Sequence, residues 1–223
     1  MNNPAREAIL SSIRSHLVAS VRFDRQELPQ VNLENPVILS KEGSTPRPLP
    51  EWFAQRLESV DGRCIIAKTA TDIADALSRI ITDLKAQRIA ISDNPEAERL
   101  LHLTDLEIEE LGIAPNASDI FRFDVGITTA QAAIAETGTL VLDSTYERHR
   151  LVSLVPPVHI AIVAASRICE TLGDALTLLR TGPEISPAVT FITGPSRTAD
   201  IELTLAIGVH GPQELYVIIN GSS

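Results

Sequence analysis

Residues 194–202 have the composition of an anion-binding loop. The apolar run 189–192 precedes them and a second apolar run, 201–207, begins within them, so the order predicts a strand, a tight turn and the start of a helix. A helix start carries unpaired amide groups and a partial positive charge, which suit a carboxylate or phosphate. Arg197 would add a planar guanidinium donor. The ligand-binding candidates in this segment are Gly194, Ser196, Arg197, Thr198 and Asp200.

Glu136 is the leading candidate for acid–base chemistry. It ends the strand-like run 132–136, and the short connection from this run to the run 139–143 contains Gly138 and predicts a β-hairpin with Glu136 at its tip. A carboxylate on a tight turn is rigidly aimed and could act as a general base or a nucleophile. Its neighbours Thr137, Gly138 and Thr139 would supply backbone amides and hydroxyl groups to the same ligand.

Both segments also have a purely structural interpretation. In that interpretation Ser196 only caps a helix and Arg197 pairs with Glu202 or Asp200. Glu136 would then be an ordinary solvated turn residue.

A short basic cluster, residues 148–150, is the third candidate region. In an acidic chain such a cluster suits a small anionic ligand, so Arg150 is a ligand-binding candidate, although surface ion pairing explains it equally well. His159 begins a buried strand and is expected to be a hydrogen-bonded structural histidine. His210 lies in the turn 208–212 and is a weak catalytic candidate, provided that this turn lies beside the Gly194 loop.

Composition narrows the function classes. The chain has 223 residues and a net charge of −10, which opposes binding to nucleic acid. Its two cysteines, Cys64 and Cys169, form no CxxC pair, so we predict neither an iron–sulfur cluster nor a metal site in this chain. No apolar run is long enough to span a bilayer and no secretory signal is recognisable, so we expect a cytoplasmic protein. Sequence motifs for dinucleotides, nucleoside triphosphates and serine hydrolases are absent.

The elements that must position these residues follow an alternating pattern. An N-terminal helix with Ile9 and Ile13 on one stripe leads into a proline-rich arm, so we expect a first region over residues 1–50 and an α/β domain over 51–223. In that domain we predict four helices, over residues 53–60, over 73–84 with Thr71 as its cap, from residue 94 onward, and over 172–179. We predict further strands over residues 63–67, 88–91, 158–163, 189–192 and 215–219. Alternating strands and helices favour a mixed, mostly parallel sheet.

Three segments, 124–142, 150–160 and 194–212, together resemble the LUD-domain family. The resemblance covers the last half of the chain densely and the preceding α/β section loosely. It implies a three-layer α/β/α fold similar to the CoA-transferase and ribose-phosphate-isomerase group, preceded by the N-terminal helix and arm. It also implies a role in oxidising L-lactate to pyruvate, as the non-cluster member of a three-protein system whose other members are iron–sulfur proteins.

Two other functions stay open at this stage. The fold group also contains stand-alone CoA-transferases and formyltetrahydrofolate cyclo-ligases, in which Glu136 would be a nucleophile. A non-catalytic assembly or metabolite-sensing protein would make use of the long arm over residues 20–50. In the hypothesis of L-lactate oxidation, a small carboxylate binds to Arg197 and Arg150, and Glu136 is the acid–base group.

Overall fold

A computed structural model of the chain describes residues 7, 9–15, 47–180, 187–199, 205–207 and 211–221. The chain divides into two compact units, Met1–Glu42 and Gly43–Ser223. In the first unit, residues 9–15 are helical, as the sequence pattern predicts. The predicted arm lies almost wholly outside the described residues. No helix in the described ranges combines the length and the hydropathy needed to cross a membrane.

A six-stranded sheet forms the centre of the second unit, and all its neighbouring strands are parallel. In spatial order its strands are β1 (Arg63–Ala67), β12 (Glu214–Asn220), β7 (Val158–Ala164), β4 (Val125–Ala130), β2 (Arg88–Ile91) and β3 (Glu110–Ile113). The three strands β12, β7 and β4 lie in the middle, where both faces of the sheet are covered. Most of their side chains are accordingly buried and apolar, as is typical of buried parallel strands, and Thr128, Thr129 and His159 are buried polar exceptions.

A second sheet of four strands covers part of one face of the first. Its strands, in spatial order, are β8 (Ile168–Cys169), β5 (Ala132–Ile134), β6 (Thr139–Asp143) and β9 (Val189–Ile192). The chain passes into it from β4 and from β7, so the two sheets share connections at one edge. A separate antiparallel hairpin joins β10 (Arg197–Ala199) to β11 (Leu205–Ile207). The β-hairpin predicted from the sequence is the antiparallel pair β5–β6 of the second sheet.

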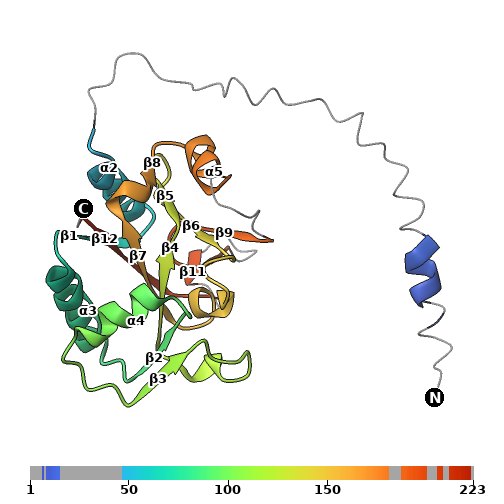
Figure 1. The fold of residues 1–223 in the computed structure, drawn as a ribbon, viewed down its shortest axis with the longest axis horizontal. Coiled ribbons are helices and arrows are strands. Elements are labelled where there is room, and N and C mark those ends of the chain that lie inside the picture. Colours follow the sequence, from blue (N-terminus) through green and yellow to red (C-terminus); the bar gives the residue numbers. More distant parts are fainter. Residues whose placement is uncertain are drawn as a thin grey trace. The chain divides into compact units, whose positions relative to one another are not determined.

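Helices complete the layers on both sides, which confirms the predicted three-layer α/β/α class (Figure 1). Helices α3 (Ala70–Leu84) and α4 (Pro95–His102) pack on one face through the largest apolar cluster. Helix α2 (Leu49–Glu58) and the second sheet pack on the other face. Helix α5 (Leu172–Arg180) covers the outer side of the second sheet through Ala175. Three short 3-10 turns, η1 (Ile120–Arg122), η2 (Arg150–Ser153) and η3 (Ala165–Arg167), complete the described elements.

The N-cap of α3 lies two residues earlier in the chain than predicted. Thr69, and not Thr71, is the N-cap: its hydroxyl accepts from the Asp72 amide at 3.1 Å. The Asp72 carboxylate accepts in return from the Thr69 amide at 2.9 Å, which completes a capping box. Asn94 caps α4 as predicted, and Pro95 follows it at the first helical position.

Candidate functional site

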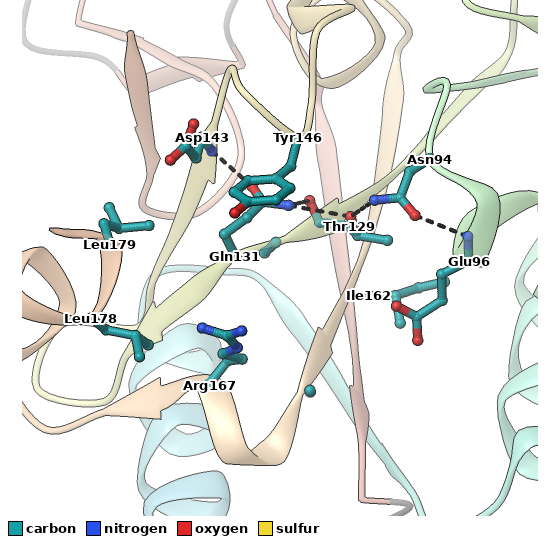
Figure 2. Close-up of a pocket in the computed structure, with 12 residues that line it drawn as sticks. Asn94, Glu96, Thr129, Gln131, Asp143, Tyr146, Ile162, Arg167, Leu178 and Leu179 are labelled. Carbon is teal, nitrogen blue, oxygen red and sulfur yellow. Dashed lines mark hydrogen bonds between the residues drawn. The ribbon is translucent and has the colours of Figure 1, made fainter. Parts of the chain in front are cut away.

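A cavity of about 430 Å³ opens at the carboxyl edge of the parallel sheet, where β2, β4 and β7 end. We call it the edge cavity. Ligands of open α/β sheets bind at this edge, because the loops that leave the strands diverge there. It lies between the start of α4 and the end of α5 (Figure 2). Its polar and charged lining residues are Asn94, Glu96, Thr129, Gln131, Asp143, Tyr146 and Arg167.

Arg167 provides the cationic group of the edge cavity. It ends η3, and Figure 2 shows its guanidinium pointing toward the side chain of Gln131. Among the described residues, no carboxylate lies within 4 Å of this guanidinium. Leu178 and Leu179 of α5 and Ile162 of β7 form the apolar lining. The cavity therefore combines a guanidinium with a small apolar surface, and the acidic residues Glu96 and Asp143 also line it.

Two side-chain amides, those of Asn94 and Gln131, form one wall of the edge cavity on either side of Thr129, and their orientations are fixed by backbone groups. The Oδ1 atom of Asn94 accepts from the Glu96 amide at 2.9 Å, so its Nδ2 must face Thr129, to whose Oγ1 it donates at 2.8 Å. The Oε1 atom of Gln131 accepts from the Asp143 amide at 2.7 Å, so its Nε2 also faces Thr129. The amide nitrogens, and not the oxygens, therefore converge on this wall.

Glu147 lies behind Thr129 and is 2% exposed. Its Oε1 accepts from the Thr129 hydroxyl at 2.5 Å and from the Thr129 amide at 2.8 Å. Its Oε2 has no hydrogen-bond partner among the described residues. Burial raises the pKa of Glu147 above its usual range, although interactions with the side chain of Ser92 and with Thr129 oppose that change. The Thr129 hydroxyl thus gives its hydrogen to Glu147 and faces the two amides only as an acceptor.

The edge cavity was not predicted from the sequence, because strand β4 was not predicted. Residues 125–130 form a central strand, yet they were not assigned to one. Asn94 was identified only as a helix cap. A usable signal was present: polar residues follow directly after two buried strands, at Ser92–Asn94 and at Gln131, and such positions meet at the carboxyl edge of a parallel sheet.

The predicted glutamate turn is present and lies against the end of α2. Strands β5 and β6 pair antiparallel, and residues 135–138 form the turn. Glu136 is exposed, and its backbone amide donates to the Glu170 carbonyl at 3.1 Å. Gly138 has a φ of 66°, and a Cβ there would lie 2.4 Å from the backbone nitrogen of Leu57. The turn therefore requires glycine at this position.

The predicted helix after Gly194 is wrong, because Arg197–Ala199 form strand β10 and pair with Leu205–Ile207. The described residues 194–199 accordingly contain no helix start that could bind an anion. Arg197 forms an ion pair with Asp61, in the loop after α2, and this pairing occupies the guanidinium that was expected to meet a ligand. Gly194 has a φ of 79°, and a Cβ there would lie 2.5 Å from the Val60 carbonyl oxygen.

The two predicted loops are nevertheless neighbours. The hydroxyl of Thr139 lies 2.7 Å from that of Thr137 and 2.7 Å from that of Thr193, so a chain of hydroxyl groups joins the glutamate turn to the loop before Gly194. Both loops also touch the last turn of α2 and the residues after it, as the Cβ positions of Gly138 and Gly194 show. These contacts bring the two backbones together.

A second cavity, of about 240 Å³, lies beside the Gly194 loop and is lined in part by Gly194, Ser196 and His159. His159 is fully buried, as expected, with its Nε2 2.8 Å from the Thr128 hydroxyl. Burial lowers the pKa of His159 to about 3, so its imidazole is neutral. Glu136 and Arg150 do not line either cavity.

The remaining candidates are placed as follows. Arg150 is exposed at the start of η2. The backbone of Thr198 belongs to β10. Asp200 and His210 lie outside the described residues. Within the described ranges, no group of three histidine, cysteine or acidic side chains is arranged to hold a metal ion.

The sequence of the second unit matches a known domain family. The model of the LUD domain matches residues 50–220, so the chain belongs to the LUD domain family. Lactate utilization protein C of Exiguobacterium sp. is 44% identical over 104 residues, which are 44% of this chain and 45% of that protein. This match thus spans about half of the relative's length. Lactate utilization protein C of Anoxybacillus flavithermus is 27% identical over 220 residues, 96% of this chain and 98% of that protein.

A solved structure shares the fold. The crystal structure of a DUF162 family protein from Deinococcus radiodurans aligns with a TM-score of 0.59 and 21% sequence identity. The alignment covers 78% of this chain and 96% of that one. This similarity supports the arrangement of sheets and helices described above.

Proposed function

We propose that this chain takes part in lactate utilisation, as the non-cluster component of a cytoplasmic system that oxidises L-lactate to pyruvate, and that its edge cavity binds a small carboxylate. The observation that carries the ligand assignment is Arg167, whose guanidinium points into that cavity with no carboxylate partner among the described residues. A guanidinium binds a carboxylate through two parallel hydrogen bonds. The names of the relatives support the choice of lactate.

Iron–sulfur partner proteins are part of the same proposal. Oxidation of L-lactate to pyruvate releases two electrons and two protons, and an acceptor has to receive both electrons. The two cysteines of this chain, Cys64 and Cys169, are far apart in sequence and cannot ligate a cluster, which takes four cysteine thiolates. We assign the electron-accepting clusters to partner proteins and the binding of the carboxylate to this chain.

The glutamate turn and the Gly194 loop are a second location for the same ligand. Glu136 stays the acid–base candidate there, with Arg197 and Arg150 as the basic groups. Because Arg197 already pairs with Asp61, a ligand at that location would have to displace a carboxylate. We therefore place the ligand in the edge cavity first.

Growth on L-lactate tests the proposal and separates the two locations. The gene is deleted in a host with no redundant lactate dehydrogenase, and rescue is compared for the wild type, Arg167→Ala, Arg197→Ala and the control Arg99→Ala, an exposed arginine of α4. We expect the deletion strain to fail, and Arg99→Ala and Arg197→Ala to rescue it as the wild type does. Arg167→Ala should not rescue, although the protein accumulates to the wild-type level.

Three outcomes would change the proposal. Normal growth of the deletion strain would remove the lactate function. Failure of Arg197→Ala with rescue by Arg167→Ala would move the ligand to the Gly194 loop. Rescue by both variants, with unchanged co-purification of the partner proteins, would indicate an assembly protein that binds no carboxylate.

A further inference from the structure

We infer that the side chains of Asn94 and Gln131 form a paired amide-donor site for an oxygen atom on C2 of the carboxylate that Arg167 binds. The inference rests on the proposed function for the carboxylate itself. It adds that the edge cavity selects 2-oxo and 2-hydroxy carboxylates over carboxylates that carry no oxygen on C2. The selecting residues are the two amides that meet at Thr129, of which that of Gln131 lies on the side of Arg167.

Hydrogen bonds within the wall occupy the side-chain carbonyl oxygens and leave N–H groups that can donate to a ligand. Both side-chain carbonyl oxygens are taken by backbone amides, those of Glu96 and Asp143. Asn94 uses one of its two N–H groups on Thr129, so one N–H group is left. The Nε2 atom of Gln131 lies 3.3 and 3.4 Å from two oxygens of Thr129, and at these distances the bonds are weak enough for a ligand oxygen to replace them.

The hydrogen bonds of Thr129 keep the two amide nitrogens, and not the amide oxygens, on this wall. A hydroxyl group has one hydrogen to donate, and that of Thr129 is given to the buried Glu147 at 2.5 Å. Its remaining positions are acceptors, and the nitrogens of Asn94 and Gln131 face them. The wall therefore cannot reorient to satisfy a ligand that needs acceptors, nor does it suit an apolar CH₂ group.

The position of Arg167 connects this wall to the carboxylate. Its guanidinium points toward the side chain of Gln131 (Figure 2), so we place the carboxylate between the two, with its neighbouring carbon, C2, on the side of the amides. The side chains of Leu178, Leu179 and Ile162 line the rest of the cavity and suit a methyl group at C3. Pyruvate and L-lactate carry all three features, whereas propionate has the carboxylate and the methyl group but no oxygen on C2.

Binding of three ligands to the full chain tests the inference. Pyruvate, L-lactate and propionate are titrated by isothermal calorimetry or by NMR into the wild type and the variants. Propionate has no oxygen on C2, so the amide donors would have no partner in its complex and its binding should be weaker. We therefore expect pyruvate and L-lactate to bind about tenfold more tightly than propionate. Asn94→Ser keeps a good helix cap but removes the amide donor, and should lower this ratio severalfold with little change for propionate.

Gln131→Glu and Asn116→Ser complete the comparison. Gln131→Glu keeps the acceptor for the Asp143 amide and loses the donor, so the ratio should fall although its new charge weakens all three ligands. Asn116→Ser, at an exposed loop position, should bind as the wild type does. Equal binding of pyruvate and propionate to the wild type, or a ratio that neither wall variant lowers, would overturn the inference and leave the carboxylate site intact.

Arg167→Ala separates the inference from the proposed function. It should weaken all three ligands together, because all three carry the carboxylate. If none of them binds the wild type, or if Arg167→Ala binds them normally, the carboxylate site itself is wrong and the C2 selectivity fails with it.

Discussion

Gly138 determines how closely the glutamate turn approaches α2. Its φ of 66° lies in the left-handed region, which residues with a side chain adopt only with strain. An added Cβ would also lie 2.4 Å from the backbone nitrogen of Leu57 and 2.7 Å from the backbone carbon of Arg56. Backbone atoms of a helix end cannot move aside as the tip of a flexible side chain can. The turn that carries Glu136 therefore depends on this single residue type.

We expect Gly138→Ala to lower the free energy of unfolding by roughly 1–3 kcal/mol, because it adds backbone strain and a contact with α2. Gly173→Ala is the matched control. Gly173 lies in α5, and the nearest atom to an added Cβ is 3.7 Å away, so alanine should be neutral or stabilise by up to about 1 kcal/mol. Urea unfolding of both variants measures the difference. Equal stabilities of the two would contradict the assigned turn geometry.

For single residues, the sequence predicted local roles such as helix caps better than it predicted the distant partners of each side chain. Asn94 was predicted as a helix cap, and it is one, but the cap uses only its Oδ1 atom. The second role, in which its Nδ2 faces Thr129, depends on a residue 35 positions away. Likewise Arg197 was expected to meet a ligand or a nearby acid, whereas its partner is Asp61. Contacts between residues far apart in sequence were not accessible from local patterns.

At the scale of elements, local patterns predicted most of the α/β alternation and failed where tertiary pairing decides. Strands 63–67 and 88–91, helix α3 and the β5–β6 hairpin carry clear apolar patterns and were predicted. The segment after Gly194 was predicted as a helix, but it forms β10 because 197–199 pair with 205–207. Pairing partners of this kind override a weak helical pattern. The missed strand β4 contains Gly126 and threonines among its apolar residues, which hides its burial.

Helix α3 connects β1 to β2 and so helps to place the residues that follow β2 at the edge cavity. Its capping box makes the start of this helix a test at the element scale. Thr69→Ala removes the acceptor for the Asp72 amide, and we expect it to lower the free energy of unfolding by about 1 kcal/mol.

Thr82→Ala, at an exposed position within the same helix, is the control for this change and should not destabilise the protein, since alanine has the higher helix propensity. Both variants should bind pyruvate as the wild type does, because α3 contributes no residue to the lining of the edge cavity. Unfolding in urea and a pyruvate titration check the two expectations. A Thr69→Ala protein as stable as the wild type would show that the capping box contributes little.

For the whole molecule, burial of β4 and β7 between two layers produces the electrostatic environment of the interior. Thr128 and Thr129 are consecutive residues of β4, so their side chains point to opposite faces of the sheet. Thr128 contacts the imidazole of His159, and Thr129 contacts the carboxylate of Glu147. Each face of one strand thus places one ionisable group where water is excluded, and folding changes the proton affinity of both.

Acid unfolding should report this burial through His159. Its pKa is about 3 in the folded protein and 6.5 in the unfolded chain, so below pH 6.5 the unfolded chain binds a proton that the folded protein does not. The free energy of unfolding should therefore fall as the pH drops from about 6.5 toward 3, by up to about 1.4 kcal/mol per pH unit from this group.

His159→Gln lacks the titration, so its stability should depend less on pH over this range, whatever its stability at pH 8. Thr128→Val keeps the buried imidazole and should keep the wild-type slope at a lower stability. Urea unfolding at intervals from pH 8 to pH 4.5 measures all three slopes, and parallel curves for the wild type and His159→Gln would mean that His159 is not the buried, neutral group that the structure describes.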